Sequence, residues 1–296
     1  MIEASRETER RSAPTGRRPE VVRTIAEMRA RVAAWHGAGE TVAMVPTMGA
    51  LHAGHLSLVE EGYARADRVV VSIFVNPTQF APHEDFQTYP RTEEADLSAL
   101  TGVGADMVFA PSAIEMYPLG NATRLEMAGP ARGLESDFRP HFFGGVATVV
   151  AKLLIACGPD VAIFGEKDYQ QLAVVRQMVS DLSLPVSIVG GATVREADGL
   201  AMSSRNAYLS PEERAVAPRL HAEMQKVAAV VRAGGDAETA VEAARVAILA
   251  AGFRQFDYLA LRNAVTLAPP EKPGEPLRLL AAAWLGRTRL IDNIAV

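Results

Sequence analysis

The chain has 296 residues, of which 49% are hydrophobic and 22% charged, the balance of a soluble globular protein. Its formal net charge of −5 argues against nucleic-acid binding, which needs a surface rich in Lys and Arg. No apolar run reaches the roughly 18 to 20 residues of a membrane span, and the N-terminus lacks the apolar stretch of a signal peptide. The single cysteine, Cys157, excludes an intrachain disulfide. We therefore expect a cytoplasmic protein with no membrane partner.

Residues 1–20 are rich in Arg, Glu, Ser, Thr and Pro, which predicts a disordered extension. Helical and strand-like patterns then alternate. The predicted helices span residues 24–36, 54–66, 92–100, 144–157 and 167–182, and the predicted strands span residues 42–46, 68–75, 106–110, 160–164 and 185–189. This rhythm predicts an α/β fold, with a Rossmann-like parallel-sheet domain over residues 21–205.

The pattern changes after Arg205. Two helices rich in Ala, Glu and Arg are predicted over residues 211–233 and 237–251, separated by a pair of glycines. Three strand-like segments follow, over residues 255–261, 277–285 and 288–294. We therefore predict a smaller α+β domain over residues 206–296.

The first predicted strand leads into His52-Ala-Gly-His55, where a helix is expected to begin. A helix N-terminus presents unpaired N–H donors and attracts phosphate. Gly54 leaves its backbone open to an anion, and His52 and His55 lie one helical turn apart, so both can face it. Taken alone, the motif leaves open a metal half-site or two solvated side chains.

Two further polar motifs follow predicted strands: residues 76–79 and residues 165–168. Ligands of parallel α/β sheets bind beyond the carboxyl ends of the strands. We therefore expect both motifs to share one rim of the sheet with the histidines.

Several stretches together resemble the pantothenate synthetase (pantoate–β-alanine ligase) family. They are residues 46–55, 74–80, 89–92, 146–152, 164–171 and 195–206, and residues 290–294 resemble the end of the family's sequences. The resemblance spans residues 21–296. It implies a nucleotidyltransferase-type Rossmann fold with a small C-terminal domain. It also implies an enzyme that joins pantoate to β-alanine through a pantoyl adenylate, consuming ATP and releasing AMP and pyrophosphate, with Mg²⁺ as cofactor and a homodimer as assembly.

The resemblance also implies the site residues. Those expected to contact ATP are Met48, Gly49, Ala50, Leu51, His52, Ala53, Gly54, His55, Gly165, Glu166, Lys167, Asp168, Val194, Met202, Ser203, Ser204 and Arg205. His55 is the family's proton donor. Gln79 and Gln171 are expected to bind pantoate, and Gln79 also lies near β-alanine in the family.

The chemistry of the first half-reaction needs no general base, because a carboxylate is already ionised at neutral pH. The enzyme must instead position its reactants and neutralise charge on the departing pyrophosphate. We hypothesise that His52, His55, Lys167 and Arg205 do this, with Lys167 and Arg205 on the β- and γ-phosphates. Without the shared rim, either cation would be read as a solvated surface charge.

The metal site is weakly specified by the sequence. Asp96, on the helix predicted after residue 92, is the candidate ligand for Mg²⁺. Zinc at the two histidines is disfavoured, because no Cys or third His lies at ligand spacing. The chain also departs from the family at residues 139–143, where Phe142 stands in the usual place of a histidine and His141 precedes it.

Two alternatives remain at this stage. Another nucleotidyltransferase could use the same histidine motif, but it would need basic residues for an acceptor phosphate where this chain offers Gln79 and Gln171. A nucleotide-binding protein without turnover would not need the histidine, lysine and Ser-Ser-Arg set.

Overall fold

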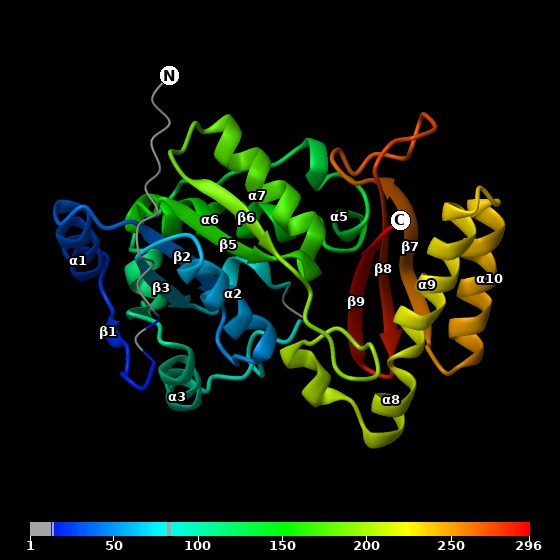
Figure 1. Ribbon diagram of the computed structural model, residues 1–296, viewed down its shortest axis with the longest axis horizontal. Coiled ribbons are helices and arrows are strands. Elements are labelled where there is room, and N and C mark those ends of the chain that lie inside the picture. The colour runs from blue at the N-terminus through cyan, green and yellow to red at the C-terminus, as the bar shows by residue number, and fades with distance from the viewer. Residues whose placement is uncertain (1–12, 14, 82–83) are drawn as a thin grey trace.

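The computed structural model describes residues 13, 15–81 and 84–296. They form one unit around a six-stranded parallel sheet and a second unit around a three-stranded antiparallel sheet (Figure 1). The predicted α/β class, Rossmann-like sheet and smaller α+β unit are confirmed. Among these residues, no helix has the length and apolar character needed to cross a bilayer.

The parallel sheet accounts for most of the first unit. Its strands are β1 (Glu20–Val22), β2 (Val42–Thr47), β3 (Arg68–Ile73), β4 (Met107–Phe109), β5 (Val161–Gly165) and β6 (Ser187–Gly191). Its helices are α1 (Ile25–Gly37), α2 (Ala53–Tyr63), α3 (Glu93–Val103), α4 (Ala113–Met116), α5 (Glu135–Phe138), α6 (Phe142–Cys157) and α7 (Tyr169–Asp181). The predicted elements are present with ends shifted by a few residues. The unpredicted β1, α4 and α5 are too short to show a periodic pattern.

Side chains of the central strands alternate between two cores. Val42 and Met44 of β2 pack with α1, α6 and α7, whereas Ala43 and Val45 pack with α2 and α3. The sheet is therefore covered on both faces, which explains its nearly continuous apolar strands.

The strand order is β1-β4-β3-β2-β5-β6. The chain moves outward from β2 through β3 to β4 and later returns to β5 on the other side of β2. The order therefore reverses between β2 and β5, and ligand crevices of open α/β sheets form at such a point. Because β2 leads to His52 and β5 leads to Lys167, these two residues meet at this crevice.

The second unit carries two long helices on one face of its sheet. Its elements are α8 (Pro211–Val216), α9 (Arg219–Arg232), α10 (Ala237–Ala250), β7 (Gln255–Asn263), β8 (Leu277–Leu285) and β9 (Thr288–Ala295). The prediction of one helix over residues 211–233 is wrong, because the chain breaks at Pro218 between α8 and α9. Proline has no N–H and its ring clashes with the preceding turn.

Residues 1–12 and 14 of the predicted extension lie outside the described residues, whereas its last residues take part in the fold. The Gly16 N–H donates to the Thr101 carbonyl at 2.9 Å, and Glu20 begins β1. The domain boundary after residue 205 stays a prediction, although Leu200 already packs in the core of the second unit.

Buried charges join the two units. Glu135 receives hydrogen bonds from Arg139 and from Arg289 of β9, each at 2.9 Å. Arg139 also pairs with Glu84 at 2.6 Å, and Arg289 pairs with Asp257 at 2.6 Å. Burial opposes ionisation of Glu135, but the two arginines outweigh it and hold its pKa below the usual range. This part of the contact between the units is therefore an alternating row of opposite charges.

Candidate functional site

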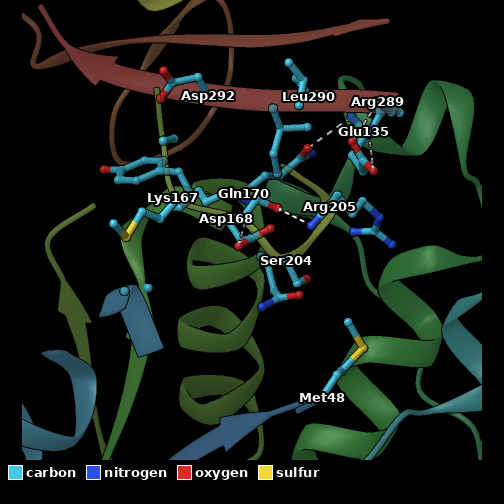
Figure 2. A pocket seen from close by; sticks show the side chains of 18 of the residues that line it. Met48, Glu135, Lys167, Asp168, Gln170, Ser204, Arg205, Arg289, Leu290 and Asp292 are labelled. Carbon is cyan, nitrogen blue, oxygen red and sulfur yellow. Dashed lines mark hydrogen bonds and ion pairs between the residues drawn. The ribbon is translucent and has the colours of Figure 1, made fainter. Parts of the chain in front are cut away.

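A cavity of about 1090 Å³ opens between the units, above the β2–β5 crevice (Figure 2). The predicted residues that line it are Met48, His52, Gly54, His55, Gln79, Gly165, Lys167, Asp168, Gln171, Val194, Met202, Ser203, Ser204 and Arg205. Its wall does not include Gly49, Ala50, Leu51, Ala53 or Glu166. The structure thus brings together segments that lie up to 157 residues apart (Met48 to Arg205).

The two histidines make the side-chain hydrogen bonds at the start of α2, and both line the cavity. His52 is the N-cap, and its Nδ1 accepts from the Gly54 N–H at 3.1 Å. The Nδ1 of His55 accepts from the His52 N–H at 3.3 Å. Because each Nδ1 is an acceptor, the hydrogen-bond network places the proton of each neutral ring on Nε2. A Cβ at Gly54 would lie 3.0 Å from the His52 ring, so a larger residue there would have to displace that ring.

Both imidazoles are neutral at pH 7. Burial, followed by the nearby Lys167, lowers the pKa of His52 to about 4. Burial, followed by the His52 and Lys167 charges, lowers the pKa of His55 to about 3. The pair therefore presents two Nε2–H donors without a positive charge of its own.

These pKa values predict an acid-sensitive fold. Unfolded, His55 binds a proton near pH 6.5, but folded it does so only near pH 3. Stability is therefore fully present above about pH 6.5 and falls as the pH drops, with a loss from His55 of about 2 kcal/mol at pH 5. Urea unfolding at several pH values measures this. His55→Gln should flatten the pH dependence, whereas His36→Gln, at an exposed histidine, should not; equal slopes in all three proteins would contradict the assignment.

Asp96 holds the loop that leads to His52. Its side chain is 2% exposed and accepts from the Ala50 N–H at 3.0 Å and the Leu51 N–H at 2.8 Å. Ala50 has a φ of 50°, a left-handed conformation that is unfavourable for alanine and must be held by its surroundings. Asp96 is not part of the cavity wall, so the structure gives it the role of a loop anchor and no support as a magnesium ligand.

Gln79 is presented by a short 3₁₀ turn, η1 (Pro77–Gln79). Its Oε1 accepts from Asn76 Nδ2 at 3.1 Å, and its Nε2 contacts Met48 Sδ at 3.1 Å. Asn76 Nδ2 also donates to the Gly145 carbonyl at 3.2 Å. Sulfur is a weak acceptor, so the Gln79 amide N–H can turn to a substrate oxygen.

Gly145 allows α6 to approach this turn. A Cβ there would lie 2.5 Å from the Thr78 carbonyl oxygen and 2.8 Å from Gln79 Cα. Gly145→Ala should displace the turn and, if Gln79 binds pantoate, raise the KM for pantoate about tenfold or more. Steady-state kinetics with pantoate varied checks this. Gly102→Ala is the matched control, since that helical glycine has open space around it; equal KM values in the two variants would contradict the prediction.

Lys167 lies in the 3₁₀ turn η3 (Glu166–Asp168) between β5 and α7. Its Nζ is 3.7 Å from Asp168 Oδ2, a long contact for an ion pair. The charge of Lys167 lowers the pKa of both histidines. Lys167 and the two Nε2–H groups can therefore act on the same bound ligand.

Arg205 lines the cavity, and its guanidinium is paired with a carboxylate there. Its guanidinium donates to both oxygens of Asp85, each at 3.0 Å. The charge of Arg205 is therefore partly compensated, and a contact with phosphate would use the N–H groups that do not bind Asp85. Neighbouring Ser204 lies 3.3 Å from the Tyr89 hydroxyl, and Ser203 Oγ accepts from the Arg205 N–H at 3.3 Å.

Comparison with known proteins identifies the family. The model of the pantoate-β-alanine ligase family matches residues 20–295. The chain belongs to this family. A pantothenate synthetase of Mesorhizobium japonicum is 57% identical over 279 residues, covering 94% of this chain and 98% of that protein. A pantothenate synthetase of Paramagnetospirillum magneticum is 56% identical over 93% of this chain and 97% of its own length.

Solved members of the pantoate-β-alanine ligase family share the fold. The Thermus thermophilus pantothenate synthetase superposes with a TM-score of 0.87 at 48% identity, covering 93% of this chain and 98% of that one. The Francisella tularensis pantoate-β-alanine ligase, solved in complex with beta-gamma ATP and β-alanine, gives 0.77 at 33% identity, covering 94% and 97%.

Three residues of the site make contacts that were not predicted from the sequence. Asn76, 1% exposed, precedes a proline at the start of η1 and follows the usual rule for helix caps, so its role could have been found. Asp85 pairs with a residue 120 positions away, and no local pattern signals that. Phe142, in the place of the family's usual histidine, lies under the Arg139 guanidinium at 3.9 Å and lines the cavity.

Proposed function

We propose that this enzyme ligates pantoate and β-alanine through a pantoyl adenylate, with ATP as the source of the AMP group. The observation that carries the proposal is a single cavity that combines two neutral histidine donors, one lysine and two glutamine side chains. The Francisella tularensis enzyme, which has the same fold and was solved in complex with beta-gamma ATP and β-alanine, supports it.

The triphosphate is proposed to lie at the start of α2. There the N–H groups of the first helical turn and the Nε2–H groups of His52 and His55 can donate to the phosphates. Neither histidine would first have to break an ion pair. Lys167 adds the positive charge. As pantoate's carboxylate attacks the α-phosphorus, the bond to the β-phosphate oxygen breaks and charge grows on pyrophosphate, where these groups stabilise it.

The histidines are poor candidates for a general base. In each ring Nδ1 already accepts a backbone N–H and Nε2 carries the proton. His55 as a proton donor to the leaving group requires an imidazolium, and a bound triphosphate would raise its pKa toward that state. The β-alanine amine must lose its proton by another route, and we assign that step to solvent.

Pantoate is proposed to lie between Gln79, Gln171 and an apolar wall. Gln171 is partly buried on α7, and both it and Gln170 line the cavity, but the amide of Gln170 is already bonded to main-chain groups around residues 130–135. Amides donate and accept, which suits a carboxylate and two hydroxyls. Pro46, Met48 and Phe74 line the cavity and suit the gem-dimethyl group.

Mg²⁺ fits this site only as an ion held mainly by the phosphates. Among the described residues, no group of three or more His, Cys, Asp or Glu side chains could hold a metal. Mg²⁺ in nucleotide sites typically takes phosphate oxygens with one or two carboxylates, and Asp168, which lines the cavity, is the proposed carboxylate. The ion would neutralise charge on the pyrophosphate.

We further propose a homodimer in the cytoplasm. The family resemblance supports the dimer, and exposed apolar side chains such as Leu119 and Ile155 offer surface for it. The buried, unpaired Cys157 supports a reducing compartment. Light scattering of the purified chain tests the assembly.

The proposed reaction is tested by a coupled assay for AMP with each substrate omitted in turn. AMP should accumulate only when ATP, pantoate and β-alanine are all present. Pyrophosphate should exchange into ATP with pantoate alone, which reports the adenylate. AMP formed without pantoate, or exchange that requires β-alanine, would overturn the adenylate route.

A further inference from the structure

The last strand, β9, crosses beside the cavity, and Figure 2 shows its residues Leu290 and Asp292 near Lys167 and Asp168. Residues 290–294 resemble the end of the family's sequences, but the resemblance implies no role for them. Successive side chains of a strand point to opposite faces. Leu290 and Ile294 join the core of the second unit, so Asn293 faces the first unit. It is 3% exposed.

Asn293 forms hydrogen bonds to the turn that carries Lys167. Its Nδ2 donates to the main-chain carbonyl of Glu166 at 2.9 Å and to that of Lys167 at 2.8 Å. An amide nitrogen has two N–H groups, so both are used on this turn.

Arg278 sets the orientation of that amide. Its Nε donates to Asn293 Oδ1 at 2.7 Å, and its Nη2 donates to Glu166 Oε2 at 3.2 Å. Its guanidinium also stacks on the Tyr169 ring at 4.0 Å. A flipped amide would place oxygen against two carbonyls and nitrogen against a guanidinium, so only one orientation satisfies all the groups.

The residue before Asn293, Asp292, holds a second segment of the proposed ATP site. Asp292 is 5% exposed and receives two hydrogen bonds from Arg195, at 2.7 and 2.8 Å. Arg195 directly follows Val194, which lines the cavity. The Asn293 N–H donates to Asp292 Oδ1 at 2.7 Å, so the two anchors are linked.

We propose that Asn293 is a positioning residue for adenylation, which acts by holding Lys167 in register with the histidine pair. The inference rests on the proposed function, since it gives Lys167 its work on the triphosphate. A misplacement of about 1 Å can lower a rate on the order of 10²-fold. Asn293 touches no reacting atom and acts only through the turn.

The test separates the two half-reactions. Asn293→Asp keeps the shape and an acceptor for Arg278 but loses both donors, and Asn293→Ala removes them without adding charge. Each should lower pantoate-dependent ATP–pyrophosphate exchange on the order of 10²-fold. Formation of pantothenate from supplied pantoyl adenylate and β-alanine should be unchanged, because that step does not use the triphosphate. Asn263→Asp, in the same sheet but outside the cavity, is the control and should leave both rates unchanged.

A double-mutant cycle shows whether the effect passes through Lys167. In the Lys167→Ala background, Asn293→Ala should cause no further loss of exchange, since the group that it positions is gone. Full additivity would overturn the proposal, as would equal loss of both half-reactions in folded Asn293→Ala. Exchange in the unsubstituted chain is measured first: its absence would reject the proposed function, whereas its presence with no effect of Asn293→Ala would reject this inference alone.

Discussion

Replacing Lys167 with alanine is expected to lower pantoate-dependent pyrophosphate release by about 10³-fold, because the cavity loses the cation nearest the histidine donors. Arg205 is expected to substitute for it only weakly, because both oxygens of Asp85 bind its guanidinium and offset its charge. Rapid-quench measurement of pyrophosphate in a single turnover gives the rate. Lys226→Ala is the matched control, since that side chain is 67% exposed on α9.

Lys167→Ala has a second expected result that does not depend on turnover. Lys167 contributes to the low pKa of His52 and of His55. Without it both pKa values should rise, although burial will still hold them below 6.5. NMR titration of the ring protons measures the change. Near-normal pyrophosphate release together with unmoved titrations would remove Lys167 from the site.

Replacing Asp96 with alanine is expected to lower both stability and adenylation. Two buried N–H groups, of Ala50 and Leu51, lose their acceptor, and each such group costs about 1–3 kcal/mol. We expect the free energy of unfolding to fall by about 3 kcal/mol, and the loop before His52 to relax from its left-handed conformation. Urea unfolding and the exchange assay measure the two effects.

The same variant distinguishes a loop anchor from a metal ligand. If Asp96 held Mg²⁺, Asp96→Ala would raise the Mg²⁺ requirement, and excess Mg²⁺ would restore the rate in a protein of normal stability. As a loop anchor, its loss should not respond to Mg²⁺. Asp96→Asn keeps one acceptor oxygen, so its free energy of unfolding should lie between those of the unsubstituted protein and Asp96→Ala.

The sequence predicted the parts of this molecule that depend on local patterns. Period and alternation located the long strands and helices, and the rule for carboxyl ends of strands placed His52, Gln79 and Lys167 on one rim. Pairings between distant segments carry no such signal. The Asp85–Arg205 pair joins residues 120 positions apart, and the hydrogen bonds of Asn293 to η3 form only when the two units meet. Pro218 is a local signal for the break between α8 and α9.

The row of charges between the units has a consequence for how variants will behave. The cavity is complete only in molecules whose two units are docked, so its apparent affinity for any substrate equals the intrinsic affinity scaled by the docked fraction. A substitution at Arg289 or Glu135 would lower the docked fraction. It would therefore weaken the apparent affinities for ATP, pantoate and β-alanine by one common factor. A substitution in one wall, such as Gly145→Ala, would instead weaken binding of the substrates beside that wall and leave the KM for ATP unchanged. The pattern of the three KM values thus separates assembly of the site from recognition within it.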